Sequence, residues 1–493
     1  MQTAIPSWDR KDGYLTVFMA LILPLILSLY FALLQGARMN ASRLEVTCAA
    51  DAAADAAMTE FSAALFSRYD LFFIDTSYGS GFCSEAALSS RLTYYFEKNL
   101  MPSPVHSVLG AGSFTGLTGE AVLVTGTRYA ADLSYLPLRQ QIYAYMSADP
   151  AGALAAGLAE ILDLWEGLPV DPAGWSGKME EAGQSLEGLL EKSRRRQEEQ
   201  LEEEEEGEEH PDREGNLLSE FASFRDQPVL AQVLGEETGV SGARTDLSVL
   251  FSGRGRISGT GLVTENSHDY PPASSLVLNA YLAEKCGSYT KAREGSLLQY
   301  QLEYILQGKD SDKANLEKTV ETLLFMRWAL NGFFLVKDPA RQAELDAAAA
   351  ALSLALLIPE FEPMVKAALL AAWAYLESIQ DLKILLRGGR IPLVKNPETW
   401  KTDLESLAHM TTSDTEEGAA GLAYGEYLQI LLYIEGSDLR CQRLMDIMEM
   451  DIRRTPGNEA FRMDGCLDSF AMEARACDGL GFVYAVTRNV TYN

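Results

Sequence analysis

Residues 14–61 read YLTVFMALILPLILSLYFALLQGARMNASRLEVTCAADAAADAAMTEF, and the rest of the chain is organised around this stretch. From Tyr14 to Leu34 it carries no charge. At about 1.5 Å per residue, a helix of this length matches the roughly 30 Å hydrocarbon core of a bilayer. Pro24 stands at mid-span, where a membrane helix tolerates a kink. We therefore expect a retained transmembrane helix; the alternative, a cleaved secretory signal, has only a weak cleavage site at residues 35–37.

The helical pattern continues beyond the apolar run. Alanine and other helix formers recur at steps of three and four, and no Gly or Pro interrupts Ala37 to Arg68, which predicts one continuous rod over residues 14–68. Small side chains on such a rod permit close approach of another helix. Asp51 and Asp55 share one face, either as a solvated stripe or as carboxylates that fix register with a neighbouring subunit. The expected assembly residues are Ala49, Asp51, Ala52, Ala53, Asp55 and Ala56.

Composition limits the function classes. The chain has 493 residues, 47% hydrophobic and 23% charged, which is ordinary for folded protein. Its 41 basic and 70 acidic residues give a net charge of -29, which opposes nucleic-acid binding and docking on anionic lipid through a basic patch. The six cysteines form no CxxC pair or disulfide framework, and Cys466 and Cys477 are interpreted as unpaired thiols in a helical region. No second segment is long and uncharged enough to cross a membrane.

The sequence indicates an α+β protein in which the transmembrane helix is followed by a mixed sheet region and a predominantly helical unit. Short strands are expected at residues 71–74 and 121–130, strand-like character at 247–263, and a strand with alternating burial at 298–306. Helices are expected at 312–335, 340–358, 363–386 and 427–450, and a terminal strand from Gly481. The predicted segments are a tail at 1–13, the helical rod at 14–68, an α/β region at 69–184, an acidic low-complexity insertion at 185–216, a strand-rich segment at 217–270 and a mostly helical domain at 271–493.

Two acidic motifs are candidate sites. Asp75 and Ser77 follow an apolar run, as in a metal-dependent adhesion site, but Gly79 replaces the last serine of that pattern, so a strand entering a Gly-Ser turn is the alternative. Glu377 and Asp381 share a helix face and suit acid–base work only if a cleft raises one pKa. The alternative is that they face Lys383 or Arg387. Because HExxH, GxSxG and Walker motifs are all missing, we expect no enzyme activity, no catalytic residues and no cofactor.

The N-terminal residues resemble a known family. Gly13, Thr16, Val17, Ala20 and Leu21, followed by Arg38, Leu44 and residues 49–53, are similar to the start of TadE/TadG-like proteins of bacterial Tad (Flp) pilus assembly. In cleaved pilins of that system a glutamate sits five places after the glycine; here Phe18 occupies it, so an uncleaved anchor is implied. The resemblance also implies a single-pass protein of the bacterial cell membrane, with a cytoplasmic tail and a large C-terminal region outside.

Four later stretches resemble a bacterial family of unknown function often encoded near such pilus genes; they are residues 69–79, 303–317, 372–395 and 461–466. We expect a non-enzymatic, membrane-anchored component of Tad-type pilus assembly or a related surface apparatus. Its partners are expected to be the membrane and other pilus-assembly or surface proteins, bound through the N-terminal helix, with a homo-oligomer as a further option. The alternative function is a membrane-anchored receptor or adhesion module with a divalent metal at Asp75 and Ser77.

Overall fold

The structure is a computed structural model that describes residues 12–101, 115–148, 152–168, 188–196, 217–235, 239–260, 274–410 and 421–492, with residues 174, 177, 178, 181, 262 and 412. The chain divides into two compact units. Unit 1 consists of Met1–Pro137, Arg256–Ser267 and Gly457–Asn493, and unit 2 of Leu138–Gly255 and His268–Pro456. Each unit therefore combines segments that are distant in the sequence. The glutamate-rich part of the predicted acidic insertion, residues 198–209, lies outside the described residues.

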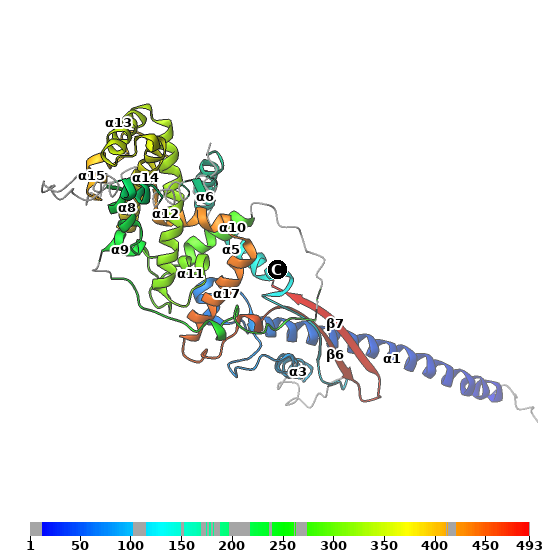
Figure 1. Cartoon of the computed structure of the whole chain (residues 1–493). Helices are drawn as coiled ribbons and strands as arrows, with labels where there is room; N and C mark the ends of the chain where they lie inside the picture. Colours follow the sequence, from blue (N-terminus) through cyan, green and yellow to red (C-terminus); the bar gives the residue numbers. More distant parts are fainter. Residues whose placement is uncertain are drawn as a thin grey trace, which may run out of the picture. The chain divides into compact units, whose positions relative to one another are not determined.

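Helix α1, Asp12–Met58, contains the apolar run and the alanine-rich segment in one element (Figure 1). The predicted continuation to Arg68 is wrong, because the helix ends ten residues earlier. Beyond it the backbone N–H of Ser62 donates to the carbonyl oxygen of Phe73 at 2.8 Å, and Phe61 forms an isolated bridge with Ile74. These tertiary bonds compete with the helix, so it ends without a Gly or Pro to mark the position.

Strand β6, Cys466–Cys477, is the centre of the sheet of unit 1. It pairs antiparallel with β7, Val483–Thr491, along one edge, where β1, Ile74–Asp75, follows. Strands β3, Leu123–Tyr129, and β2, Thr118–Gly119, occupy the other edge. The strand predicted at 121–130 and the terminal strand are confirmed. The helical interpretation of Cys466 and Cys477 is wrong; burial alternates along the second half of β6, as in a strand with one covered face.

Two helices of unit 1 begin at serine caps. Ser62 Oγ accepts from the N–H of Leu65 at 3.4 Å at the start of α2, Ala63–Tyr69. Ser84 Oγ accepts from the N–H of Ala86 at 3.1 Å at the start of α3, Glu85–Leu100. A short 3-10 turn, η3, Met463–Gly465, precedes β6. The buried residues of α3 recur every four positions, as in an amphipathic helix; they are Leu88, Leu92, Phe96 and Leu100.

The strand-like segment predicted at 247–263 does not form a strand among its described residues. In unit 2 it contains only the 3-10 turn η1, Leu247–Val249. In unit 1 two of its backbone N–H groups donate hydrogen bonds to carboxylates. The N–H of Ile257 donates to Asp464 at 3.0 Å, and the N–H of Gly259 donates to Asp132 at 3.1 Å. Carboxylates thus replace the ladder partners that a strand would need.

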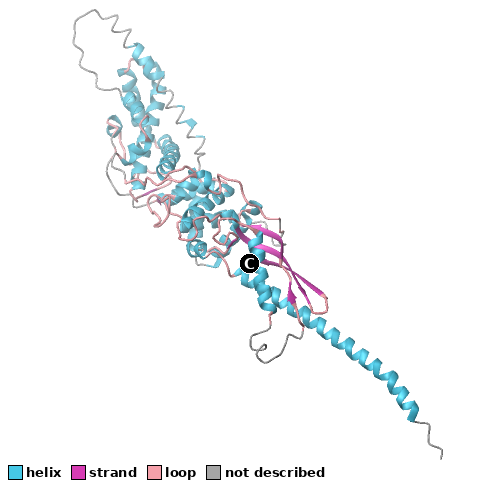
Figure 2. Cartoon of the chain, turned by 90° about the horizontal axis from the view of Figure 1, so that it is seen from below, coloured by secondary structure: helices cyan, strands magenta, loops and turns pink. Residues whose placement is uncertain are grey.

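Unit 2 is built mainly of helices (Figure 2). Leu133–Tyr135, at the start of α5, have positive φ, so the regular helix begins only after them. The expected helices at 312–335, 340–358 and 363–386 are confirmed as α12, α13 and α14. The described part of residues 217–270, expected to be strand-rich, contains α8 and α9 instead. The first helices are the part of α5, Asp132–Ala148, that follows Pro137; α6, Gly152–Glu166; α8, Leu217–Arg225; α9, Val229–Leu234; and α10, Ser274–Lys285. The next are α12, Asp312–Lys337; α13, Pro339–Ala355; the 3-10 turn η2, Pro359–Phe361; and α14, Glu362–Leu386.

The strand predicted at 298–306 is wrong. Residues Gln301–Gln307 form helix α11, and Gln301 and Glu303, expected on a solvent face, are buried. Gln301 Nε2 donates to Asp451 Oδ2 at 2.9 Å, and Glu303 Oε1 accepts from the N–H of Tyr289 at 2.8 Å. The alternation of polar and apolar residues therefore does not report burial here, because buried partners satisfy the polar side chains.

The single helix expected at 427–450 is two helices. Helix α16, Tyr424–Ile434, ends before Gly436, which is the N-cap of α17, Ser437–Arg453. Two short strands, β4, Arg390–Ile391, and β5, Leu422–Ala423, pair antiparallel, and a short helix α15, Leu404–Ala408, lies between them in sequence. The protein is therefore a mixed α/β structure with many helices, few strands and one long apolar N-terminal helix.

Candidate functional site

The first half of α1 is apolar and exposed. Leu21, Leu25 and Phe31 are 71%, 66% and 59% exposed, and no part of the most apolar window of the helix is buried. Among the described residues, α1 is the one helix long and apolar enough to cross a membrane. Ser28 Oγ donates to the carbonyl oxygen of Leu25 at 2.8 Å, so its polar atom is satisfied within the helix. A continuous apolar surface of this kind indicates contact with lipid or with another apolar partner.

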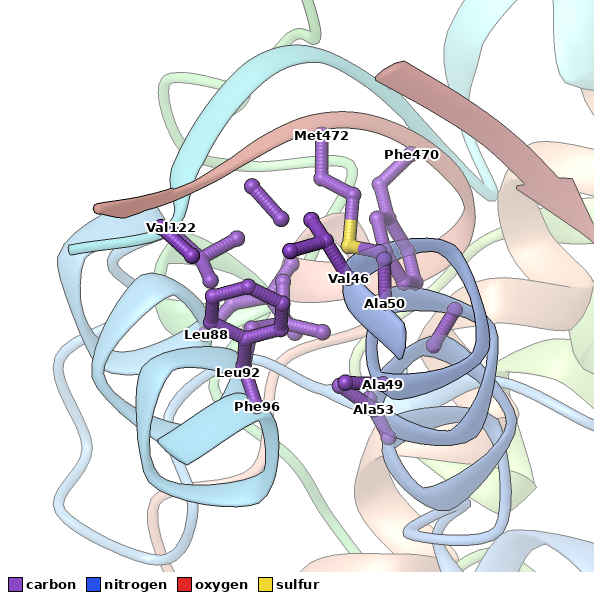
Figure 3. Close-up of a cluster of buried hydrophobic side chains, with 14 of the residues drawn as sticks. Val46, Ala49, Ala50, Ala53, Leu88, Leu92, Phe96, Val122, Phe470 and Met472 are labelled. Atoms are coloured by element: carbon purple, nitrogen blue, oxygen red, sulfur yellow. The ribbon is translucent and has the colours of Figure 1, made fainter. Parts of the chain in front are cut away.

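The second half of α1 belongs to the core of unit 1. Val46, Ala50 and Ala53 have no exposed surface. Figure 3 shows this face of α1 surrounded by α3 and β6. Alanine permits the close approach of the neighbouring helix and sheet, because its side chain is a single methyl group. The residues that α3 and β6 contribute include Leu88, Leu92, Phe96, Phe470 and Met472.

The predicted assembly residues therefore divide into two groups. Ala49 and Ala53 are buried against the chain's own core, whereas Asp51, Ala52 and Ala56 are half-buried and Asp55 is exposed. Because α3 and β6 cover the buried pair, Ala49 and Ala53 do not form an open surface for a second helix. The sequence contained the alanine periodicity but not the identity of the element that covers it.

A half-exposed ion pair ties the alanine segment to β7. Arg488 on β7 donates to both carboxylate oxygens of Asp51, with Nη2 at 3.4 Å from Oδ2. Asp51 therefore has a basic partner in its own chain. Of the two interpretations of Asp51 and Asp55 in the sequence, a solvated stripe and a pairing with basic residues, the second expected the basic partners on a neighbouring subunit.

Polar contacts also fix α1 where the exposed apolar half ends. Arg38 Nη2 donates to the carbonyl oxygen of Thr115 at 3.0 Å and lies 3.9 Å from Asp478 Oδ2. Two turns further along α1, Glu45 Oε2 accepts a hydrogen bond from Thr115 Oγ1 at 2.6 Å. The docked half of α1 is thus fixed to the rest of unit 1 from its first basic residue after the apolar run.

The alternative metal motif is a closed turn. The N–H and Oγ of Ser77 both donate to Asp75, each at 2.9 Å, and Ser77 Oγ accepts from the N–H of Gly79 at 3.2 Å. Both oxygens of Asp75 are therefore used within the loop. Across the described parts of the chain, no group of three His, Cys, Asp or Glu side chains gathers as a metal site.

Glu377 and Asp381 are fully buried in unit 2 and do not pair with Lys383 or Arg387 as the alternative reading expected. Asp381 lies 2.8 Å from Arg327 Nη2 and 2.6 Å from Lys395 Nζ, and Lys395 also pairs with Glu377. Burial alone would raise the pKa of Asp381, but Lys395 and Arg327 outweigh it and hold that pKa below its usual range.

This ionic cluster, Arg327, Glu377, Asp381 and Lys395, balances two cations with two anions. Glu377 also accepts from the N–H and Oγ1 of Thr402, at 2.8 and 2.7 Å. The cluster therefore fastens the connection after β4 to α12 and α14, and its carboxylates are engaged by fixed partners. Sequence reasoning missed Arg327 and Lys395, because each is far from both acids in the sequence.

Comparison with curated proteins and with solved structures finds no match. Residues 205–478 match the family of unknown function DUF5702. Three of the four stretches noted above for their resemblance to a family of unknown function, residues 303–317, 372–395 and 461–466, lie within this match. Since the matched residues make up more than half of the sequence, the chain belongs to the DUF5702 family.

Proposed function

We propose that this protein is a non-enzymatic, single-pass membrane component of Tad-type pilus assembly or of a related cell-surface apparatus. The single observation that carries the proposal is the division of α1 into an exposed apolar half and a half docked in the core of unit 1. The resemblance of the first sixty residues to TadE/TadG-like proteins supplies the pathway and the orientation, with the N-terminus inside and the C-terminal region outside.

The mechanism follows from the continuity of α1, which is one helix from Asp12 to Met58. One uninterrupted helix transmits the position of the membrane segment to unit 1, because Arg38, Glu45 and Asp51 fix its second half. Partners then pack against the apolar half within the membrane. They also meet the part of the docked half that α3 and β6 leave open.

That open part is a stripe defined here as Leu44, Cys48 and Asp55, all of them exposed. Their spacing of four and seven residues places them on one side of the helix. Leu44, beside Glu45 in the docked half of α1, is an apolar side chain that is 65% exposed. The stripe replaces the alanine face as the proposed contact for a second copy or another assembly protein.

Cysteine cross-linking in intact cells tests this proposal. Oxidation should cross-link the full chain through the native Cys48 or through Leu44→Cys, and Cys48→Ser should abolish the first product. Ala53→Cys in the Cys48→Ser background is the matched control, because the introduced side chain faces the core and should give no product. Mass spectrometry of the product then distinguishes a second copy from a different protein.

Two results together would remove the proposal. One is the lack of any cross-link at all three stripe positions, with Asp55→Cys included. The other is unchanged surface pili or surface appendages when the protein is deleted from a bacterium that produces them.

A further inference from the structure

A cavity of 380 Å³ in unit 2 is lined by a buried cation, Arg440, that forms no ion pair among the described residues. Arg440, at the start of α17, is 1% exposed. Its Nη2 donates to Ser275 Oγ at 2.7 Å, and its Nη1 donates to Asn279 Oδ1 and, at 3.4 Å, to the carbonyl oxygen of Ser275. Its Nε is buried and has no hydrogen-bond partner. Within the described part of the chain, Arg440 donates hydrogen bonds only to neutral acceptors. Burial lowers its pKa, although the carboxylate of Glu435 acts in the opposite direction without a hydrogen bond to it.

A buried guanidinium without a counterion is costly, since charges removed from water are normally paired. The ionic cluster of the same unit shows the usual arrangement, with each buried cation facing a carboxylate. Arg440 differs because no carboxylate among the described residues is hydrogen-bonded to it and the space beside it is a cavity. The missing negative charge is therefore expected from a ligand that enters this cavity.

Other groups in the cavity wall favour an anion. Arg139 lies in the wall and is compensated by the exposed Asp438, while its Nη2 also donates to Ser437 Oγ at 3.2 Å. Ser437 is the first residue of α17, whose N-cap, Gly436, has no side chain to occupy the first N–H groups. The positive end of the helix dipole is thus available beside Arg440.

The remaining wall residues limit the kind of anion. Glu435 also lines the cavity and repels a second negative charge, so a monoanion fits better than a dianion. Ile142, Val277 and Leu278 supply an apolar wall for the rest of the ligand. A carboxylate that carries an apolar group meets both conditions.

We propose that this cavity binds a carboxylate with an apolar tail, held by Arg440 and the first turn of α17. The site is independent of the membrane helix and goes beyond the assembly role proposed above. The ligand is either a free carboxylic acid or the C-terminus of a peptide, since both present the same carboxylate next to an apolar group.

Calorimetric titration of the full chain in nonionic detergent tests the proposal, with hexanoate as the probe and hexanamide as its neutral match. Hexanoate should bind saturably and at least about tenfold more tightly than hexanamide, as expected when a charge-assisted hydrogen bond is lost. Arg440→Gln should weaken hexanoate binding by a similar factor. Arg195→Gln, which changes a 71% exposed side chain outside this cavity, should leave binding unchanged.

Glu435→Gln keeps the test valid even if Arg440→Gln fails to fold, because it should strengthen hexanoate binding several-fold. Acetyl-alanyl-leucine, a peptide with a free C-terminus, identifies the source: tighter binding than hexanoate indicates a chain end, and weaker binding a free acid. Three results would overturn the proposal: no saturable binding of hexanoate, equal binding of hexanoate and hexanamide, or tighter binding of inorganic phosphate than of hexanoate.

Discussion

Asp381→Asn should destabilise unit 2 strongly, because it removes one charge from a fully buried cluster while preserving the shape of the side chain. In the native protein Asp381 Oδ2 accepts from Arg327 Nε at 2.9 Å and from Asn331 Nδ2 at 3.0 Å, and Oδ1 lies 2.6 Å from Lys395. The variant leaves two buried cations, Arg327 and Lys395, with Glu377 as the one remaining anion of the cluster.

The expected loss is about 3–5 kcal/mol in the free energy of unfolding, the usual effect of removing one partner of a buried ion pair. With a urea dependence of about 3 kcal/mol per molar, typical of a larger domain, the unfolding midpoint falls by roughly 1–1.7 M. Tryptophan fluorescence in urea reports this transition, since Trp328, Trp373 and Trp400 are all buried in unit 2.

A matched control uses an exposed pair on a helix of the same unit. Lys318 and Glu321 lie 2.8 Å apart at 54% and 32% exposure, so Glu321→Gln should change stability by less than about 0.5 kcal/mol. Adding Arg327→Met to Asp381→Asn restores the balance of one cation and one anion, and the double variant should lose less than the sum of the two single losses. An unchanged midpoint for Asp381→Asn, or strict additivity of the two losses, would show that the buried charges of this cluster do not depend on one another.

Three other predictions concern separate parts of the protein. Burial raises the pKa of Glu303 to about 7, so its ionisation should remove up to about 3 kcal/mol of the free energy of unfolding as the pH rises from about 4.5 through 7. Urea unfolding at successive pH values should show this loss in the native protein but not in Glu303→Gln. The same dependence of stability on pH in both proteins would contradict the prediction. Ala53→Leu overfills the interface of α1 with α3 and should lower the free energy of unfolding by about 1–3 kcal/mol, which faster hydrogen exchange in α3 would report. Ala56→Leu is the control and should have little effect, because Ala56 is only half-buried. Asp51→Asn should cost less than about 1 kcal/mol, because its ion pair is half-exposed, and 1 M salt should remove most of the difference; a larger, salt-independent loss would count against a surface pair.

The long elements were predictable because they depend on local patterns. The apolar run of α1 and the buried stripes of α12 and α14 are continuous over many turns, and such signals survive changes in tertiary context. The end of α1 was not predictable, since a hydrogen bond from Ser62 to Phe73 stops it and no residue type marks the position.

Burial of polar residues explains the remaining differences. Gln301 and Glu303 suggested a solvent face and hence a strand, but buried partners satisfy both and the segment is helix α11. The ionic cluster and the cavity at Arg440 depend on the same effect. Lys395 and Arg440 are ordinary basic residues in the sequence, and only tertiary packing shows that Lys395 is ion-paired with two carboxylates whereas Arg440, among the described residues, donates hydrogen bonds to neutral acceptors only.

The central claim is that the exposed half of α1 crosses the membrane and places the C-terminal region outside the cell. Spheroplasts of bacteria that produce the full chain with an epitope after Asn493 can be treated with proteinase K, and the fate of the epitope followed by immunoblotting. We expect the epitope to be lost from intact spheroplasts while a cytoplasmic marker survives, and the untreated chain to stay with the membrane after carbonate extraction. An epitope that survives until the spheroplasts are lysed, or a chain released by carbonate, would contradict it.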